Sequence, residues 1–232
     1  MGEWRFGLVN DLRFGERKLP RMVDQCAALA LPANTPPSEN WPLPELRVPS
    51  AEVAGWRERL GLADTGRPII ALAPGAVGPS KRWPGASYTD LARRLINQRN
   101  EVWALGGPAE APLVRIIQHG APEVRDLTNA DLRNAILGLA AADAAISNDS
   151  GLLHVAAAIG TPVVGIFGPT SPWHWAPLNP IAATVQQTVE ILSCQPCHEP
   201  TCRMRHHRCM RNISAEQVMA VIERTLADAN AG

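Results

Sequence analysis

Residues 146–168 read ISNDSGLLHVAAAIGTPVVGIFG, and the pattern of this stretch decides the fold class of the chain. It begins at the end of one apolar run, continues with the spacing of a short helix, and closes on a second apolar run, PVVGIFG. Gly160 followed by Thr161 and Pro162 ends the helix, because glycine adopts the left-handed conformation at helix C-termini and proline cannot continue a helix. Two buried strands joined by a helix are the unit of parallel sheets. The stretch therefore predicts a strand–helix–strand unit of an α/β protein.

The same alternation extends from residue 68 to residue 232. The runs PIIALAPG, EVWALGG and VRDLT predict three further strands, and the segments between them show helical spacing of apolar residues. Ser214 with Gln217 predicts a capping box at the start of the last helix, and Ser87 with Asp90 predicts a similar cap after the first strand. Strands that are apolar on both faces lie in sheets covered by helices on both sides. We therefore expect residues 68–232 to form a parallel sheet between two helical layers.

Residues 1–67 show no complete strand–helix repeat. They contain one plausible helix, KLPRMVDQCAALA, a proline-rich segment, LPANTPPSENWPLPELRVPS, and a shorter helical piece, AEVAGWRERL. Proline-rich segments form extended, semi-rigid connectors between domains. The sequence predicts a boundary at residue 68, with residues 1–67 forming the remnant of another domain and the linker to residues 68–232.

The charge and the hydropathy of the chain exclude several classes of protein. Because 22 basic residues balance 22 acidic residues, no overall field attracts nucleic acid or an anionic membrane. No apolar run approaches the roughly 20 residues of a transmembrane helix, and MGEWRFGLVND lacks the apolar core of a signal peptide. Four of the five cysteines lie between Cys194 and Cys209, unlike a secreted disulfide framework. We expect a cytoplasmic protein with no transmembrane segment and no nucleic-acid partner.

The polar residues inside the first stretch predict an anion-binding site. A strand that ends at Ser147 places Asn148 to Gly151 at the carboxyl edge of the sheet, where open α/β sheets bind ligands. The amides and the dipole of the following helix attract an anion such as a phosphate. His154 lies one turn into that helix, four residues after Ser150. A simpler alternative is that Asp149 and Ser150 only cap the helix and that His154 belongs to the core.

A second polar segment, APGAVGPSKRWPG at residues 73–85, follows the first predicted strand. Its glycines and the cations Lys81 and Arg82 could close over a diphosphate and neutralise the charge of a leaving group. The spacing of a Walker A motif is absent, so the segment is not a P-loop of that kind. On its own, the segment could also be a solvated loop with exposed basic residues.

A third polar segment, GIFGPTSPWHWAPLNP at residues 165–180, leaves the strand that follows the predicted anion site. Strands that follow each other in sequence usually lie near each other, so Gly168, Thr170 and Ser171 are expected to border the same cleft. The aromatic run at residues 173–175 either stacks on a base or sugar or packs the loop against the protein.

The fourth segment, CQPCHEPTCRMRHHRC at residues 194–209, contains four cysteines and three histidines. Its C-x2-C pair is typical of zinc sites, but the following spacings, C-x4-C and C-x6-C, are not those of the common paired C-x2-C fingers. The alternative, which we favour, is a set of reduced, partly buried thiols without a metal.

Together the four segments resemble the glycosyltransferases of family 9, the heptosyltransferases of lipopolysaccharide inner-core synthesis. The resemblance rests on PGAVGPSKRWP, SNDSGLLHVAAA, GPTSPWHWAPL and CQPCHEPTCRMRHHRCMRNISAEQV, and GEWRFGLVND is similar to a segment in the middle of such enzymes. It spans nearly the whole chain and implies a GT-B fold, in which two Rossmann-like domains enclose the active site. Residues 68–232 would be the C-terminal, donor-binding Rossmann-like domain.

The resemblance also implies a donor and the residues that bind it. The donor would be ADP-L-glycero-β-D-manno-heptose, a nucleotide sugar. Lys81 would contact the phosphates or the heptose of this donor, and Asp149 would bind heptose hydroxyls. Ser150 and Gly151 would contact the diphosphate through their amides, with His154 nearby.

The reaction implied by the resemblance is an inverting displacement at the anomeric carbon, with ADP as the leaving group. Glu110, in GGPAEAP, would correspond to an acidic residue that binds the adenosine ribose. Helix amides and Lys81 would stabilise the leaving group, so neither a metal nor another cofactor would be required. The acceptor would be the lipopolysaccharide inner core, and the protein would lie in the cytoplasm, peripheral to the inner membrane.

One departure from the family concerns the catalytic base. The family carries its acceptor site and its presumed base, an Asp, in the N-terminal domain, and this chain begins near the end of that domain. Asp11 and Asp24 do not follow a predicted strand, so the base stays unknown and we expect the chain alone to be inactive. Three alternatives remain open: a nucleotide-sugar binding module without catalysis, another GT-B chemistry such as epimerisation, and a zinc-binding interaction module.

Overall fold

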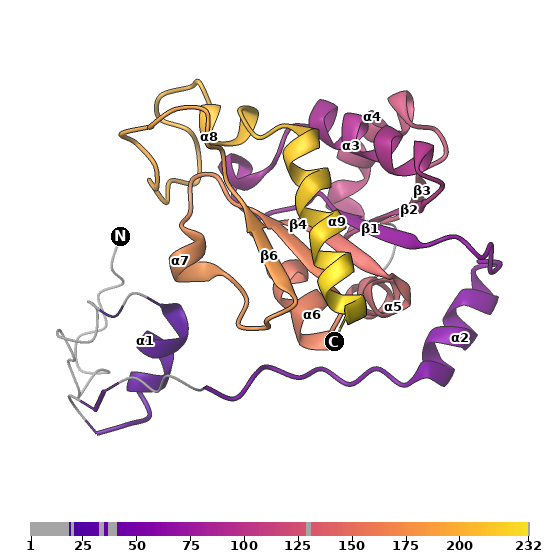
Figure 1. The fold of residues 1–232 in the computed structure, drawn as a ribbon, viewed down its shortest axis with the longest axis horizontal. Coiled ribbons are helices and arrows are strands. Elements are labelled where there is room, and N and C mark those ends of the chain that lie inside the picture. The colour runs from indigo at the N-terminus through magenta and orange to yellow at the C-terminus, as the bar shows by residue number, and fades with distance from the viewer. Residues whose placement is uncertain (1–18, 20, 33–34, 37–40, 129–130, 232) are drawn as a thin grey trace. The chain divides into compact units, whose positions relative to one another are not determined.

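The computed structural model describes residues 19, 21–32, 35–36, 41–128 and 131–231 (Figure 1). The chain divides into two compact units. The first contains the described residues up to Pro42 together with Trp173–Trp175, and the second contains Leu43–Pro172 and the residues from Ala176 onward. The second unit carries all the site residues expected from the sequence.

The second unit is built on one six-stranded sheet in which all neighbouring strands are parallel. The spatial order is β3-β2-β1-β4-β5-β6, the order of a Rossmann fold. The strands are β1 (Ile69–Ala73), β2 (Glu101–Leu105), β3 (Arg125–Leu127), β4 (Ala144–Asn148), β5 (Val163–Ile166) and β6 (Ala182–Val185). The predicted parallel sheet is confirmed, including the strand–helix–strand unit at residues 146–168.

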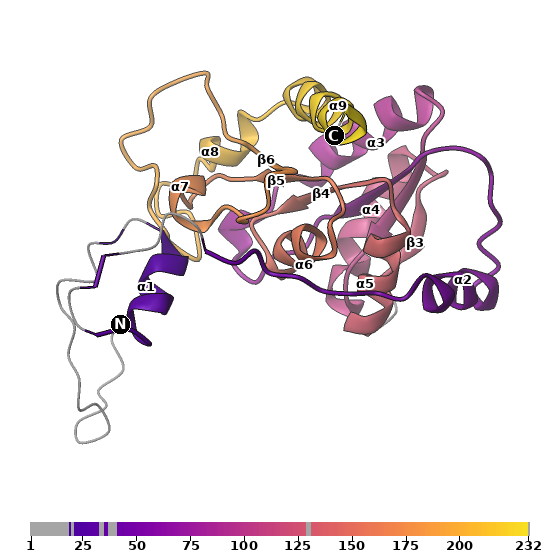
Figure 2. The same ribbon diagram turned by 60° about the horizontal axis from the view of Figure 1, so that its bottom comes forward.

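The strand order reverses between β1 and β4, which are neighbours in the sheet. Their register pairs Ala73 with Ser147, so both strands end at the same height on the carboxyl edge. The chain leaves β1 toward α3 (Gly85–Asn97) and leaves β4 toward α6 (Gly151–Ile159), and Figure 2 shows these helices on opposite sides of the sheet. A crevice opens where two such connections diverge, and this is the usual ligand site of doubly wound folds.

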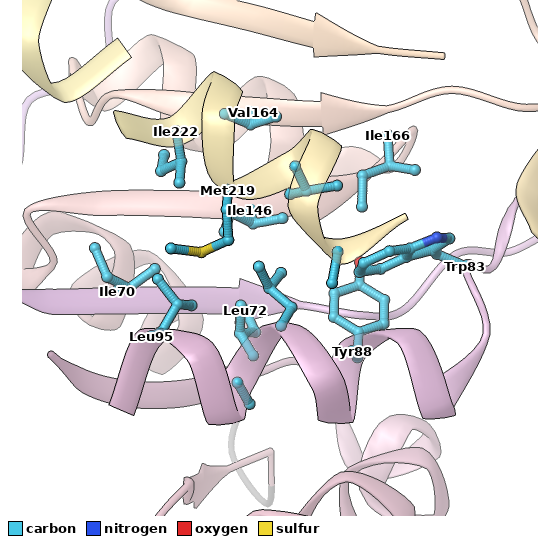
Figure 3. Close-up of a cluster of buried hydrophobic side chains, with 14 of the residues drawn as sticks. Ile70, Leu72, Trp83, Tyr88, Leu95, Ile146, Val164, Ile166, Met219 and Ile222 are labelled. Atoms are coloured by element: carbon cyan, nitrogen blue, oxygen red, sulfur yellow. The ribbon is translucent and has the colours of Figure 1, made fainter. Parts of the chain in front are cut away.

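One face of the sheet is covered by α3, α4 (Ala111–Gly120) and α9 (Ala215–Ala231). Apolar residues of the three helices and of the central strands form one continuous buried cluster. Figure 3 shows its centre, where side chains of α3 and α9 point toward β1 and β4. Trp83 and Tyr88 close this cluster near the carboxyl edge, with ring centroids 4.9 Å apart in an edge-to-face arrangement. The core therefore continues directly beneath the crevice.

The opposite face is covered by α5 (Leu132–Ala141) and α6, with α2 (Ser50–Arg59) packed against α5. Trp56 of α2 is almost fully buried, lies edge-on to Trp103 of β2, and donates a 2.8 Å hydrogen bond from Nε1 to Asn134 Oδ1. Through these contacts α2 belongs to the second unit. This unit begins at Leu43, whereas the sequence predicted a boundary at residue 68.

The two predicted helix caps have different outcomes. Ser214 and Gln217 form the predicted capping box, because each backbone N–H donates to the other residue's side chain, at 2.9 and 3.2 Å. The cap predicted from Ser87 and Asp90 is wrong, because α3 begins at Gly85, directly after Pro84. Pro84 occupies the N-cap position, so the helix starts before Ser87 can cap it.

The remaining described elements are three short α-helices, α1 (Met22–Ala28), α7 (Pro172–Trp175) and α8 (Arg208–Arg211), and two 3-10 helices, Pro79–Lys81 and Pro108–Glu110. In α1, Asp24 is buried and accepts hydrogen bonds from Arg21 and from Trp41 Nε1. The hydrogen bonds from Arg21 lower the pKa of Asp24, which makes this carboxylate a poor base. Asp11 lies outside the described residues. None of the helices in the described part of the chain is both long and apolar enough to cross a membrane.

Candidate donor site at the carboxyl edge

Asn148, the last residue of β4, holds the two diverging connections together. Its side chain is fully buried, and its Oδ1 accepts hydrogen bonds from the Trp83 N–H at 3.1 Å and from the Tyr88 hydroxyl at 3.2 Å. Its Nδ2 donates to the Pro74 carbonyl at 2.6 Å, just beyond β1. Because a buried amide must satisfy its donors and acceptors internally, Asn148 fixes the loop after β1 against the end of β4.

Asp149 follows at the mouth of the crevice and forms an ion pair with Lys81. The Lys81 Nζ lies 2.7 Å from Asp149 Oδ2, and the Thr170 hydroxyl donates to the same oxygen at 2.7 Å. Asp149 is only 5% exposed, whereas the Lys81 side chain is 31% exposed. Three segments that are distant in the sequence, namely the loop after β1, the end of β4 and the loop after β5, therefore meet at one carboxylate.

The N-terminus of α6 lies beside this ion pair, and in the described part of the chain its N-cap side chain makes no capping hydrogen bond. Ser150 is the N-cap residue, but its hydroxyl makes no cap hydrogen bond and instead lies 3.1 Å from the Ser147 hydroxyl. A Cβ built on Gly151 would meet no heavy atom within 4 Å, so the space beside its Cα is open. Uncapped amides at the positive end of a nine-residue helix favour an anionic ligand.

A cavity of about 410 Å³ adjoins the N-terminus of α6. It is bounded by the loops after β1 and β2, by the start of α5 and by the first residues of α6. Its lining includes Gly75, Glu110, Leu132, Ser150 and Gly151. This volume lies in the range of small-molecule sites in proteins.

Glu110 is fixed in this cavity by the loop after β2. Its Oε2 accepts a hydrogen bond of 2.9 Å from the Gly107 N–H. A Cβ at Gly75 would lie 2.7 Å from Glu110 Cγ and 2.8 Å from Oε1, so only glycine permits this approach. The Glu110 carboxylate is thus held at the junction of the loops after β1 and β2.

His154 lies exposed on α6, within electrostatic reach of Asp149 and Lys81. The pKa of its imidazole is lowered from its ordinary value near 6.5. Desolvation by the surrounding protein is the main cause of this lowering. The negative charge of Asp149 raises the pKa, and the positive charge of Lys81 lowers it by a smaller amount.

The structure thus brings together at one edge all six residues expected from the sequence. Lys81 contacts Asp149, Ser150 and Gly151 begin α6, and Glu110 lines the adjoining cavity. The charges of Asp149 and Lys81 both act on the pKa of His154. Thr170 borders this site as expected, whereas the central role of Asn148 was not predicted. The sequence signal that could have indicated this role is a polar residue at the end of an otherwise largely apolar strand.

A second cavity, of about 570 Å³, lies away from this edge. Its lining includes Arg47, Arg57, Ala140 and Ile159. Because Ala140 and Ile159 lie near the C-terminal ends of α5 and α6, this cavity is at the opposite edge of the sheet. It contains none of the residues expected at the donor site.

The four clustered cysteines line one smaller cavity of about 280 Å³ and are all free thiols. Burial, followed by the charge of neighbouring cysteines, raises the pKa of Cys209 to about 11. Within the described part of the chain, no three Cys, His, Asp or Glu side chains are arranged to hold a metal ion.

Comparison with known proteins shows the family of the chain. Residues 6–208 match the model of glycosyltransferase family 9 (heptosyltransferase). The chain is 35% identical over 199 residues to lipooligosaccharide heptosyltransferase 2 of Haemophilus influenzae, covering 80% of this chain and 57% of that protein. It is 30% identical to lipopolysaccharide heptosyltransferase 2 of Salmonella typhimurium, covering 98% of this chain and 68% of that protein.

The fold agrees with this relationship. The structure matches that of Escherichia coli ADP-heptose LPS heptosyltransferase II with a TM-score of 0.78 and 29% sequence identity, covering 97% of this chain and 68% of that one. The expected Rossmann-like, GT-B type of fold is therefore confirmed. The chain spans little more than half the length of the H. influenzae relative. It belongs to glycosyltransferase family 9, the heptosyltransferases.

Proposed function

We propose that this chain supplies the donor site of a lipopolysaccharide heptosyltransferase of the heptosyltransferase II type. The enzyme transfers L-glycero-D-manno-heptose from ADP-heptose to the inner core of lipopolysaccharide. The observation that carries the proposal is the Lys81–Asp149 ion pair, which lies between the uncapped N-terminus of α6 and the loop after β5. The names of the related proteins support the same donor and acceptor.

The donor fits this edge in one orientation. The adenosine occupies the cavity of about 410 Å³, where Glu110 accepts hydrogen bonds from the ribose hydroxyls. The diphosphate lies over the amides of Ser150 and Gly151 at the positive end of α6. The heptose then reaches Asp149, whose Oδ2 contacts Lys81 and Thr170. Its Oδ1 accepts a hydrogen bond from a heptose hydroxyl.

Transfer proceeds by displacement at the anomeric carbon with inversion. An acceptor hydroxyl loses its proton to a base and forms the new glycosidic bond, while the bond to the β-phosphate oxygen breaks and ADP leaves. Negative charge grows on that phosphate, and the α6 amides and Lys81 stabilise it. The base is not assigned to a residue of this chain.

We further propose that this chemistry needs no bound metal or other cofactor, because Lys81 and the α6 amides supply positive charge where the leaving group forms. The partners are the nucleotide sugar and the lipopolysaccharide inner core at the membrane surface. The enzyme works in the cytoplasm, peripheral to the inner membrane, where this acceptor would be presented.

The full-length gene product is expected to add one heptose to an inner-core acceptor from ADP-heptose and to release ADP, as measured by mass spectrometry. EDTA should leave the rate unchanged, and Lys81→Ala should lower it. Donor binding without heptose addition would instead support a binding module. A rate lost in EDTA and restored by a divalent cation would contradict the metal-free mechanism.

ADP binding is expected to raise the pKa of His154. In the free protein, desolvation disfavours the imidazolium and lowers this pKa from its ordinary value. A bound diphosphate favours the charged form, so the pKa must rise in the complex. The imidazole NMR signals of His154, assigned with His154→Gln, measure both values. An unchanged pKa at saturating ADP would place the diphosphate elsewhere.

A further inference from the structure

The cysteine-rich segment contacts the backbone directly beside Lys81. We call residues 194–207 the Cys-rich loop. Ser80, the neighbour of Lys81 in the short helix Pro79–Lys81, is only 4% exposed. Its N–H donates to the Pro200 carbonyl at 3.1 Å, and its hydroxyl donates to the Glu199 carbonyl. The Ser80 carbonyl lies 2.6 Å from Nε2 of His207. Every polar group of Ser80 therefore bonds to the Cys-rich loop.

The same loop also holds the segment that carries Thr170. The N–H groups of Cys197 and His198 both donate to the Pro169 carbonyl at 2.9 Å. Gln195 Nε2 donates to the Gly168 carbonyl, also at 2.9 Å. Thr170 follows directly and donates to Asp149. The Cys-rich loop thus contacts both segments whose side chains bind the Asp149 carboxylate.

The C-terminal end of the Cys-rich loop is anchored in the core. Cys209 and Met210 of α8 are buried in the main apolar cluster. A Cβ at Gly168 would lie 2.3 Å from Met210 Sδ, so α8 packs directly on the segment after β5. Trp83 Nε1 donates a 3.0 Å hydrogen bond to the Ile213 carbonyl, which ties the loop after β1 to the same region. The Cys-rich loop is therefore followed by a buried helix that packs against the segment after β5.

We propose that the Cys-rich loop braces the donor site and that His207 is a positioning residue for Lys81, acting through Ser80. This proposal rests on the donor site proposed above. Because a carbonyl oxygen can only accept, His207 Nε2 must carry a proton and donate to Ser80. Lysine loses much conformational freedom when it is held in place, so a fixed backbone at Ser80 lowers the entropic cost of placing Nζ against a ligand.

The variant His207→Leu removes the donor, and His207→Gln restores an N–H at the same reach. His206→Leu is the matched control. His206 contacts Cys194 Sγ and the Arg208 N–H, and neither belongs to the loop after β1 that carries Lys81. ADP affinity is measured by calorimetry, and melting temperatures show that each variant is folded. We expect His207→Leu to weaken ADP binding about three- to tenfold, the effect of one neutral hydrogen bond. His207→Gln should recover most of the affinity, and His206→Leu should keep it.

A double-mutant cycle tests whether His207 acts through Lys81. In a Lys81→Ala background, His207→Leu should have no further effect on ADP affinity. Equal effects in both backgrounds, or an unchanged affinity in His207→Leu, would overturn the positioning role.

Hydrogen exchange at residues 78–82 gives a readout that does not require ADP. The Ser80 amide should exchange faster in His207→Leu than in the wild type, but not faster in His206→Leu. If the wild-type protein fails to bind ADP, the proposed function is wrong. Hydrogen exchange at Ser80 then tests by itself whether His207 holds this segment in place. Unchanged exchange at Ser80 in His207→Leu would overturn it.

Discussion

Asp149→Ala in the full-length gene product is expected to lower kcat/KM for ADP-heptose by about 10- to 150-fold, the equivalent of about 1.5–3 kcal/mol for a lost charge-assisted hydrogen bond. The substitution removes the acceptor for a heptose hydroxyl and leaves Lys81 without the carboxylate that holds its Nζ at 2.7 Å. Because the Lys81 side chain is 31% exposed, its ammonium can turn to solvent, so the fold should survive. The rate of heptose transfer and the melting temperature check both parts.

Asp143→Ala is the matched control for this prediction. Asp143 accepts a 2.7 Å hydrogen bond from the Ile69 N–H at the amino end of β1, on the opposite edge of the sheet. Its loss should affect stability without changing donor affinity. If Asp149→Ala retained the wild-type kcat and donor affinity, the assignment of Asp149 to the donor would be wrong.

Asn148→Leu is expected to lower the free energy of unfolding by about 3–5 kcal/mol, since each buried group left unpaired costs about 1–3 kcal/mol. Leucine has a similar size but can neither accept from the Trp83 N–H nor donate to the Pro74 carbonyl. The Tyr88 hydroxyl also loses its partner in the core. The melting temperature should fall by roughly 10 °C, at about 2–4 °C per kcal/mol for a chain of this size.

Tyr88→Phe provides the comparison for Asn148→Leu. It removes only the 3.2 Å hydrogen bond to Asn148 Oδ1 and should cost about 1 kcal/mol. Urea denaturation measures the free energy of unfolding of both variants. The difference between them is the contribution of the Asn148 hydrogen bonds that do not involve Tyr88. If the two variants were equally stable, the buried amide would not be the residue that joins the two connections.

Local patterns predicted most of the second unit. The apolar runs on both sides of α6, together with the helix end at Gly160, predicted β4, α6 and β5. Because open α/β sheets bind ligands at the carboxyl ends of their strands, Asp149, Ser150 and Gly151 could then be placed at a crevice. Ser214 and Gln217 predicted their capping box because both partners lie within one helical turn.

Long-range contacts could not be predicted in the same way. The bonds from Ser80 to the Cys-rich loop join residues that are 119 and 127 positions apart, and no periodicity encodes such a pairing. The start of the second unit at Leu43 depends on the burial of Trp56 against Trp103, which is decided by packing rather than by the helix itself. The Ser87 cap failed because Pro84 began the helix earlier.

A titration of ADP followed by backbone amide NMR locates the bound nucleotide on the protein. We expect the diphosphate on the N-terminus of α6 and the adenosine in the adjoining cavity of about 410 Å³. The amide signals of Gly75, Glu110, Gly151 and His154 should shift together, with one ADP bound per chain. Shifts confined to the cavity at the opposite edge, beside Arg47 and Arg57, would show that α6 is not the donor site, as would no binding at millimolar ADP.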